Sequence, residues 1–351
     1  MKNEELIGVK EIARRANVSI GTVDRVIHNR HGVSESTRKK INDIITELNY
    51  QPNKMASLLA SKKVILIAIL IPRVSAETDY WTFPLNGIEQ AAEETRQFGV
   101  TIKYFFYDLD SRRSFKSAAQ ELIASAPQGV LLAPSFVEES KEMVSQIHEL
   151  KIPVVFINSD LPTQPGLTYI GPGLYESGRL AAQLISLSSQ PTDEIMIINI
   201  SSDLENDHHL VRKEQGFRAY FSDYKLLNRI ITVNISQTRS ESVVQSLLDA
   251  LKQNPGVKAF FVTNSRVNIV ADILKKHQKT GLLLGYDFLK NNIAYLTDGQ
   301  IDFLICQRPK EQGYLAIMAL YKHLFKISEP EKAIYMPIDI ITKENYQFYN
   351  S

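Results

Sequence analysis

The residues with the clearest chemical purpose lie near the N-terminus, on a short predicted helix that follows Ser19. The outward face of this helix carries small, polar and basic side chains: Ile20, Gly21, Thr22, Asp24 and Arg25. Such a surface suits the major groove of DNA, where base edges present hydrogen-bond donors, acceptors and methyl groups. The pattern predicts DNA binding, with a helical bundle that contacts another protein as the alternative.

Three helices must position this surface. In the first, the apolar positions Val9, Ile12, Ala13 and Ala16 share one helical face. Ser19 and Ser34 are predicted N-caps of the second and third helices, because a serine hydroxyl accepts a free backbone N–H of the first turn. The third helix repeats apolar residues at Ile41, Ile44, Ile45 and Leu48. Two helices joined by so short a turn are typical of the helix-turn-helix.

The distribution of charge agrees with a DNA-binding head. Up to Lys63 there are 12 basic and 7 acidic residues, whereas the remainder has 28 basic and 32 acidic residues. A small basic segment joined to a larger, slightly acidic body favours a nucleic-acid-binding head on a sensor domain. A small domain that is basic for unrelated reasons is the alternative.

Cys306 is the single cysteine, so no disulfide within the chain and no thiolate metal site is expected. The first residues lack the apolar core of a signal peptide, and the longest apolar run, 64–72, is too short to span a bilayer. We expect a cytoplasmic protein without membrane contact. We expect no metal or other cofactor, since the adjacent residues His208 and His209 point in different directions on regular structure.

From Val64 onward, apolar strands alternate with amphipathic helices. The predicted strands are VILIAILI, VTIKYFFY, GVLLAP, PVVFIN, EIMIINI, IITVNI, AFFVT, GLLLGY and DFLIC. Predicted helices between them include 85–98, 114–126, 140–150 and 175–188. The fold class is therefore an all-α head plus an α/β body of two doubly wound parallel-sheet lobes. A ligand cleft is expected between the lobes, at the carboxyl ends of the strands.

Signatures of catalysis are missing from the sequence. We find no GxxxxGK[ST] phosphate loop, no GxGxxG after the first strand of the body and no GxSxG nucleophile elbow. The sequence therefore favours a binding protein. A sugar-metabolising enzyme with a fused basic head is the alternative, and a transport-binding protein fits poorly with the head and the N-terminus.

The N-terminal segment resembles the LacI/GalR family of transcription regulators. The resemblance runs without a gap from Val9 to Lys63 through VKEIARRANVSIGTVDRVIHNRHGVSESTRKKI and LNYQPNKMASLLASKK. It implies that Ile20 and Gly21 occupy the main sequence-reading positions and that Arg25 pairs with guanine O6 and N7. It also implies contacts to the DNA backbone from Ser19, Thr22, Asn29 and Ser34.

The same resemblance identifies a hinge segment at Asn53, Ala56 and Leu59. In the family this segment folds on the operator, and a leucine wedges into a central minor-groove step. Leu59 is the matching residue. The alternative is that Leu58 and Leu59 are ordinary linker hydrophobes that pack on the sensor.

Two residues of the head depart from the family pattern. Asp24 stands where the family usually has serine, and His28 stands where it usually has asparagine. An aspartate near phosphates weakens binding unless it is paired, and either His28, four residues on along the helix, or Arg25 is the expected partner. Alternatively, Asp24 accepts a hydrogen bond from a cytosine amino group. Both changes leave the operator sequence open.

The body resembles the sugar-binding effector domain of that family, which is related to periplasmic ribose-binding proteins. The matching pieces are PLNGIEQAAEE, YIGPGLYESGRLAAQLI, RKEQGFRAYF, FFVTNSRV, LGYDFLKNNIAYLTDGQIDFLICQRPKEQGYLAIMAL and PIDIITKENY. Gly173 stands where the family often has aspartate. The resemblance implies an effector pocket, and it implies a homodimer that presents two heads to a palindromic operator in double-stranded DNA.

The pocket residues follow from this resemblance and from their chemistry. Asp287 can accept two sugar hydroxyls, and Asn264 offers a donor and an acceptor. Gln307 sits at a crossing between lobes. Arg212 matches a pocket arginine approximately, with Lys213 as a rival because the spacing to Gly216 is one residue long. Weaker candidates are Asp108, Asn158 and Asp160, which turn chemistry alone could explain.

Three aromatic residues follow the first strand of the body, namely Tyr80, Trp81 and Phe83. Flat rings stack on the C–H face of a sugar, so we expect them in the pocket, with a hydrophobic patch that covers a helix as the alternative. We expect the effector to be a neutral carbohydrate, because Asp287 would repel an acidic one. Arg73, Arg112 or Arg212 would permit an acidic effector if any of them faced the cleft.

The expected domain borders are 1–49 for the head, 50–63 for the hinge and 64–351 for the body. Within the body, the first lobe is expected to hold about 64–172 and 307–327. The second lobe is expected to hold about 173–306 and 328–351. The identity of the effector, and whether it releases or promotes DNA binding, stay open.

Overall fold

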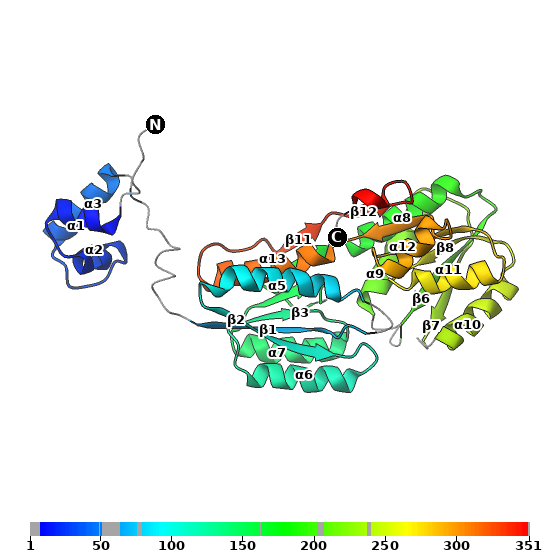
Figure 1. Cartoon of the computed structure of the whole chain (residues 1–351), viewed down its shortest axis with the longest axis horizontal. Helices are drawn as coiled ribbons and strands as arrows, with labels where there is room; N and C mark the ends of the chain where they lie inside the picture. Colours follow the sequence, from blue (N-terminus) through cyan, green and yellow to red (C-terminus); the bar gives the residue numbers. More distant parts are fainter. Residues whose placement is uncertain are drawn as a thin grey trace. The chain divides into compact units, whose positions relative to one another are not determined.

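The computed structural model describes residues 8–48, 50, 64–75, 79–161, 163–201, 207–236 and 240–349. The chain divides into two compact units, Met1–Lys62, here called the head, and Lys63–Ser351, here called the body (Figure 1). The expected hinge residues Asn53, Ala56 and Leu59 lie outside the described residues.

The head has the three helices that the sequence predicts. Helix α1 spans Val9–Ala16, α2 spans Ile20–Ile27 and α3 spans Glu35–Glu47. Ser19 caps α2 by accepting the Thr22 N–H at 3.1 Å, and Ser34 caps α3 by accepting the Thr37 N–H at 3.3 Å. The apolar faces of the helices meet in one small core, made of Ile12, Ala13, Ala16, Val23, Val26 and Ile41.

The body begins with a lobe built on a six-stranded sheet in the order β11-β5-β4-β3-β1-β2, in which every pair is parallel. Its strands are β1 (Ile65–Pro72), β2 (Val100–Tyr107), β3 (Gly129–Leu132), β4 (Val154–Ile157), β5 (Thr168–Pro172) and β11 (Ala333–Met336). Its helices are α5 (Thr82–Arg96), α6 (Arg112–Ala124), α7 (Val137–Glu149) and α13 (Pro309–Leu324). Helices α5 and α13 cover one face of the sheet, and α6 and α7 cover the other (Figure 1).

The second lobe repeats this plan with the order β12-β10-β9-β8-β6-β7, and only β12 runs antiparallel to its neighbour. Its strands are β6 (Glu194–Ile200), β7 (Ile230–Ile235), β8 (Val257–Val262), β9 (Leu282–Tyr286), β10 (Phe303–Cys306) and β12 (Asp339–Ile341). Its helices are α8 (Leu174–Ser188), α9 (His208–Asp223), α10 (Ser240–Gln253), α11 (Val267–Lys276) and α12 (Lys290–Thr297), and a 3-10 turn spans Tyr346–Phe348.

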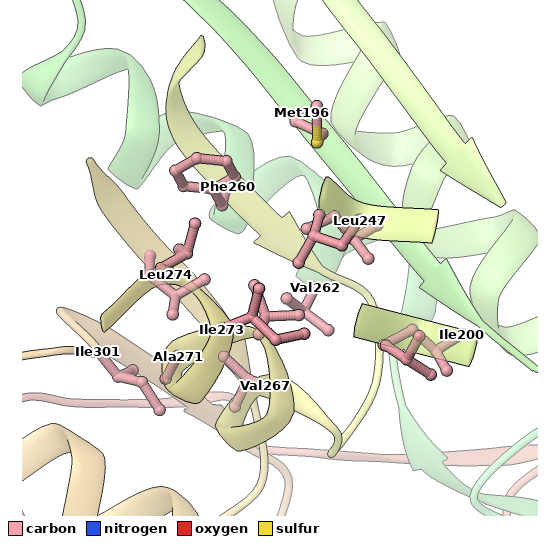
Figure 2. Packing of buried hydrophobic residues seen from close by; sticks show 14 of the residues in the cluster. Met196, Ile200, Leu247, Phe260, Val262, Val267, Ala271, Ile273, Leu274 and Ile301 are labelled. Atoms are coloured by element: carbon pink, nitrogen blue, oxygen red, sulfur yellow. The ribbon is translucent and has the colours of Figure 1, made fainter. Parts of the chain in front are cut away.

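Both faces of the second sheet are covered by apolar side chains. One face packs against α8 through Ala181 and Ile185 and against α9 through Phe217 and Phe221. The other face packs against α10, α11 and α12. Figure 2 shows the second of these cores, to which Phe260 of β8, Leu247 of α10 and Leu274 of α11 belong. Strands buried on both faces read as continuous apolar runs, which is why the sequence predicts them well.

The nine strands that the sequence predicts are all present, but three further strands are not predicted. Strand β5 contains Gly171 and Pro172, and β11 and β12 are only three or four residues long. Such short strands carry no clear period.

One expected lobe border is wrong. The expected border puts strand β11 in the second lobe, but β11 pairs with β5 in the first sheet, and the chain passes to the second lobe only between β11 and β12. The edge of a sheet selects a strand through backbone hydrogen bonds, which side-chain patterns do not reveal.

A close approach of two helices fixes the position of α9 in the second lobe. A Cβ atom at Gly178 of α8 would lie 2.0 Å from the carbonyl oxygen of Lys213 on α9, and one at Gly216 would lie 1.9 Å from the carbonyl oxygen of Tyr175. The two helices therefore touch backbone to backbone, and the side chains of α9 are held at a set distance from the sheet.

Within the described residues, no helix combines the length and the apolar character needed to cross a membrane.

Candidate functional site

The exposed face of α2 has the side chains that the sequence assigns to base reading. Gly21 and Arg25 are exposed, and Ile20 leaves 50% of its surface open to solvent. An isoleucine with half its surface in water, on a helix whose other face is buried, is a candidate for contact with another molecule. The roles of these residues in DNA recognition stay a prediction.

The residues expected to hold the DNA backbone lie at helix ends. The Ser19 hydroxyl caps α2 and lies 3.0 Å from the Thr22 hydroxyl. Asn29 has a left-handed backbone with φ of 50°, and its amide oxygen accepts a hydrogen bond from Arg38 Nη1 at 3.0 Å. Ser34, the cap of α3, is exposed.

Asp24 is paired with two basic side chains. Its carboxylate lies 3.3 Å from His28 Nε2 and 3.2 Å from Arg30 Nη1. The expected partner His28 is therefore present, whereas the second partner is Arg30 and not Arg25. Pairing reduces the repulsion that Asp24 would exert on a phosphate.

A cavity of about 480 Å³ opens between the two lobes of the body. Its walls come from the carboxyl ends of strands in both sheets, as the fold predicts. The first lobe contributes Arg73, Ser75, Tyr80, Trp81, Asp108, Leu109, Asp110, Ser135, Phe136 and Asn158. The second lobe contributes Ile200, Ser201, Asp207, His209, Lys213, Asn264, Ser265, Arg266 and Asp287, and Gln307 lies at the crossing from β10 to α13.

Seven of the ten residues predicted to bind the effector line this cavity, namely Tyr80, Trp81, Asp108, Asn158, Asn264, Asp287 and Gln307. The other three, Phe83, Asp160 and Arg212, are not among its lining residues.

Each of these three residues has a different position. Phe83 lies in the first turn of α5 and lines a small neighbouring cavity together with Tyr349. The carboxylate of Asp160 is half exposed and lies beside His208. The guanidinium of Arg212 lies over the ring of Tyr175, 5.2 Å from its centre, and donates to Gln215.

The rival residue Lys213 lines the cavity instead of Arg212. Successive residues of a helix project about 100° apart, so a shift of one position moves a side chain from the cavity to another face. Of the two residues that the sequence offers for the pocket cation, Lys213, three residues before Gly216, is therefore the one that faces the cavity.

The first lobe supplies an aromatic wall. Trp81 is 4% exposed, and its ring meets the ring of Tyr80 edge to face with 5.2 Å between the centres. The Tyr80 hydroxyl donates to the side-chain oxygen of Asn158 at 2.9 Å. Phe136, which the sequence pattern does not single out, adds a third ring to this wall.

Two side chains at strand ends are held by unusual backbone conformations. Asn158 has a φ of 67° and Asp287 has a φ of 74°, in the left-handed region that side-chain-bearing residues rarely adopt. Gln312 accepts the Asn158 N–H at 3.1 Å, and Asn292 donates to the carbonyl of Asp287 at 3.0 Å. The buried side-chain amides of Gln312 and Asn292 therefore stabilise the strained turns at Asn158 and Asp287. Backbone strain that the surrounding structure stabilises in this way is typical of functional sites.

The second lobe supplies an ionic cluster in which Lys213 is buried and Asp207, His209 and Asp287 are half-buried. The ammonium of Lys213 donates to the carbonyl of Thr263 at 3.0 Å and lies over the ring of Tyr286, 3.6 Å from its centre. The ring nitrogen Nδ1 of His209 contacts the carboxylate of Asp207. Hydrogen bonds and ring contacts thus satisfy part of this buried charge.

The cluster shifts the pKa values of its members. Burial raises the pKa of Asp287 to about 6, although Lys213 and His209 pull it down. Burial lowers the pKa of Lys213 to about 8, although Asp287 and Asp207 pull it up. Burial also acts to raise the pKa of Asp207, but the neighbouring His209, Ser201 and Lys213 outweigh it, and this pKa lies below its usual value.

The amide of Gln307 is the clearest unsatisfied donor in the cavity. Gln307 is 3% exposed, and its Nε2 atom has no hydrogen-bond partner among the described residues. A buried donor without a partner costs free energy, so a ligand acceptor there would be favoured. Asn264 differs, because its amide already donates to the carbonyl of Ile200 at 2.7 Å and accepts from the Arg266 N–H at 3.2 Å.

The sequence pattern does not single out several lining residues as effector ligands, among them Asp207, His209, Asp110, Ser135 and Arg266. All follow the end of a strand or begin the next helix. Their position after strand ends is a signal for cavity-lining residues, because the carboxyl ends of parallel strands lie at one edge of a sheet. Within the described residues, no group of three or more histidine, cysteine, aspartate or glutamate side chains could hold a metal ion.

Comparison with known proteins agrees with both units. Residues 8–53 match the family model of bacterial regulatory proteins, lacI family, and residues 67–327 match the model of a periplasmic binding protein domain. A 150-residue segment is 31% identical to catabolite control protein A of Staphylococcus aureus. That segment spans 42% of this chain and 43% of the relative, so the alignment covers less than half of either protein.

Solved structures resemble the body. A structure described as a LacI transcriptional regulator from Bacteroides fragilis has a TM-score of 0.77 and 31% identity, and it covers 82% of this chain and 100% of its own. GanP, a glucose-galactose binding protein from Geobacillus stearothermophilus, has a TM-score of 0.73 and 22% identity, covering 81% and 99% of the two chains. The second likeness concerns the fold alone. From the family matches and the Bacteroides fragilis structure together, the chain belongs to the lacI family of bacterial regulatory proteins, with a periplasmic-binding-protein domain as its body.

Proposed function

We propose that this protein is a DNA-binding transcription regulator, acting as a repressor, whose affinity for its operator is controlled by a carbohydrate bound between the lobes. The observation that carries the proposal is the pairing of an exposed recognition face on α2 with a polar and aromatic cavity in the body. Family membership supports regulation over catalysis.

On DNA, α2 would lie in the major groove with Ile20, Gly21 and Arg25 toward the bases. Ser19, Thr22, Asn29 and Ser34 would hold phosphates. Leu59, with Asn53 and Ala56, would form the hinge that enters the minor groove; these three residues lie outside the described residues and enter the proposal from the sequence alone.

The cavity suits a neutral polyol better than an ion. Three of its basic side chains face acidic ones: Arg73 lies 3.3 Å from Asp108, His209 contacts Asp207, and Lys213 is attracted to Asp287. A ligand with net charge would disturb this balance, whereas sugar hydroxyls can join it as donors and acceptors. The aromatic wall would meet the C–H face of the ring.

A palindromic operator requires a dimer, and the edge strand β2 offers a surface for one. Strand β2 lies at one edge of the first sheet, and the half-buried rings of its residues Tyr104 and Phe106 stack with 6.1 Å between their centres. A second copy that packs against this edge would cover apolar surface and protect an open strand. Sedimentation of the full chain at micromolar concentration should therefore give a dimer.

The experiment that tests DNA recognition is selection of binding sites from a random DNA library by the full chain. The wild type should select a palindrome. Arg25→Ala should lose the preference for guanine at one position of each half-site, because a bidentate arginine–guanine contact contributes about 1–3 kcal/mol of discrimination. Arg14→Ala, on the first helix, is the matched control. Selection of no sequence by the wild type, or an unchanged preference in Arg25→Ala, would contradict the proposal.

The effector is tested separately by a thermal-shift screen with neutral and acidic mono- and disaccharides. Neutral sugars should raise the melting temperature, and the best of them should change DNA affinity. By linkage, DNA must then change the affinity for that sugar by the same factor. Binding of acidic sugars alone would contradict the neutral assignment while leaving the DNA-binding role intact.

A further inference from the structure

One side-chain contact joins the two lobes immediately beside the cavity. His208 is the first residue of α9 in the second lobe, and Ser159 and Asp160 follow β4 in the first lobe. Nδ1 of His208 lies 3.4 Å from the Ser159 hydroxyl oxygen and 3.4 Å from a carboxylate oxygen of Asp160. The contact therefore crosses from one lobe to the other.

The chemistry of this contact fits a hydrogen bond. Burial lowers the pKa of His208, with Arg212 and His209 acting in the same direction and Asp160 and Asp207 opposing them. The lowered pKa favours the neutral ring, and in the tautomer with a proton on Nδ1 that proton faces both the Ser159 hydroxyl and the Asp160 carboxylate. The Ser159 hydroxyl in turn donates to the backbone oxygen of Asp160 at 3.2 Å, which leaves its lone pairs free to accept from His208.

The neighbours of these residues in the chain line the cavity. Asn158 precedes Ser159, and His209 follows His208; both face the cavity, whereas Asp160 does not. A ligand that drew Asn158 and His209 together would hold the contact closed. Conversely, a contact already made would hold the two cavity walls at a fixed separation.

We propose that His208, Ser159 and Asp160 form a latch that favours the closed arrangement of the lobes without touching the effector. The latch deepens the proposed function, because it regulates the cleft of that proposal. A ligand that binds the closed arrangement gains apparent affinity in proportion to the closed fraction, so residues outside the cavity can tune the response.

The test measures lobe separation in the ligand-free, full-length protein. Spin labels are attached to Glu142→Cys on α7 and Lys252→Cys on α10, whose side chains are 67% and 76% exposed. Cys306 is 1% exposed and should not react. Pulsed electron resonance then reports the distribution of distances between the labels.

We expect a single narrow distribution for the wild-type sequence at pH 7. His208→Ala and Asp160→Ala should each add a population at longer distance, larger in His208→Ala because Asp160→Ala keeps the contact of His208 with Ser159. The double variant should resemble His208→Ala, which already removes both contacts. His277→Ala, an exposed histidine at the end of α11, is the matched control and should leave the distribution unchanged.

Superimposable distributions for the wild type and both latch variants would overturn the proposal, as would equal broadening in His277→Ala. Asp160 lies on an exposed turn, so Asp160→Ala keeps the test valid if His208→Ala impairs folding. Because the measurement uses neither DNA nor a sugar, its failure is distinct from failure of the proposed function.

Discussion

The two walls of the cavity come from lobes with nearly the same architecture, yet their chemistry differs. The three rings of Tyr80, Trp81 and Phe136 all belong to the first lobe, where the charged pair Arg73 and Asp108 is half exposed. Among the described residues, the second lobe contributes no such ring to the lining, but it holds the buried ammonium of Lys213 and the half-buried carboxylates of Asp207 and Asp287. The same fold therefore supports a stacking surface on one side and a hydrogen-bonding surface on the other.

This difference indicates how a ligand would select the closed cleft. A pyranose has an apolar face and a polar rim, and it meets both walls only when the lobes approach. Neither wall alone offers the full set of contacts. The comparison predicts that substitutions in the second lobe cost more free energy than those in the first, because a buried charge that loses its partner is more costly than a lost ring contact.

The largest expected effect is on folding stability. Lys213→Met removes a buried ammonium that attracts Asp287 and Asp207 and leaves the buried carbonyl of Thr263 without its donor, so it should lower the free energy of unfolding by about 3 kcal/mol, since hydrogen bonds to charged groups contribute about 1.5–3 kcal/mol and an unsatisfied buried acceptor adds to the loss. Arg73→Met, in the half-exposed pair of the first lobe, should cost at most about 1 kcal/mol. Urea denaturation at pH 7 checks both values.

The loss in Lys213→Met should shrink in acid. Without the ammonium, the pKa of Asp287 in the folded protein rises further above its unfolded value. A carboxyl group with a raised folded pKa costs stability as the pH rises through that range, and the cost is relieved when the pH falls below it. Equal stability of the two variants at pH 7 would show that the second lobe does not depend on its ionic cluster.

The second effect is on ligand binding. Asp287→Ala should weaken binding of a neutral sugar from the screen by at least about 100-fold, because hydrogen bonds to a charged group contribute about 1.5–3 kcal/mol each. The sugar should change the fluorescence of Trp81, the single tryptophan, in a saturable way, and Asp287→Ala should abolish that change at the same concentrations.

Asp298→Ala is the control for this variant, since Asp298 pairs with Lys275 outside the cavity. Tight binding by calorimetry with no change in Trp81 emission would mean that the aromatic wall does not meet the ligand. The neutral sugar would then be held by the second lobe alone.

The third effect concerns pH. With the pKa of Asp287 near 6, the free protein takes up a proton as the pH falls through that value, and a hydroxyl donor must compete with it. The dissociation constant of a neutral sugar should therefore rise by up to about tenfold per pH unit below 6 and stay level between pH 6.5 and 7.5. Titration calorimetry from pH 5 to 7.5 checks the slope, and Asp287→Asn should flatten it. An acidic effector would give the opposite slope, because protonation removes repulsion.

The smallest effect is expected in the first lobe. Phe136→Leu should weaken binding of the same sugar by only about two- to tenfold, since an aromatic contact contributes about 0.5–1.5 kcal/mol beyond the area it buries. Phe98→Leu, whose ring packs on Tyr321 away from the cavity, is the control. A larger loss in Phe136→Leu than in Asp287→Ala would reverse the order of the two walls.

Much of this molecule follows from the sequence. The period of Ile12, Ala13 and Ala16, the caps Ser19 and Ser34, and the continuous apolar runs of the buried strands determine the helices of the head and nine strands of the body. These features depend on local backbone preferences and on side-chain period, which a linear sequence displays. The position of Asn158, Asp287 and Gln307 at or directly after the ends of predicted strands also indicates that they lie at a cleft.

Only the tertiary structure decided which side chains face the cavity. Lys213 lines it and Arg212 does not, because the backbone contact of α8 and α9 at Gly178 and Gly216 sets the rotation of α9. The carboxylate of Asp160 lies beside His208, and Phe83 lines a smaller cavity together with Tyr349. The pKa values of Asp287 and Lys213 likewise arise from burial among residues far apart in the chain. Rotation of a helix, pairing of a short edge strand and removal of water are properties of packing, and no short stretch of sequence contains them.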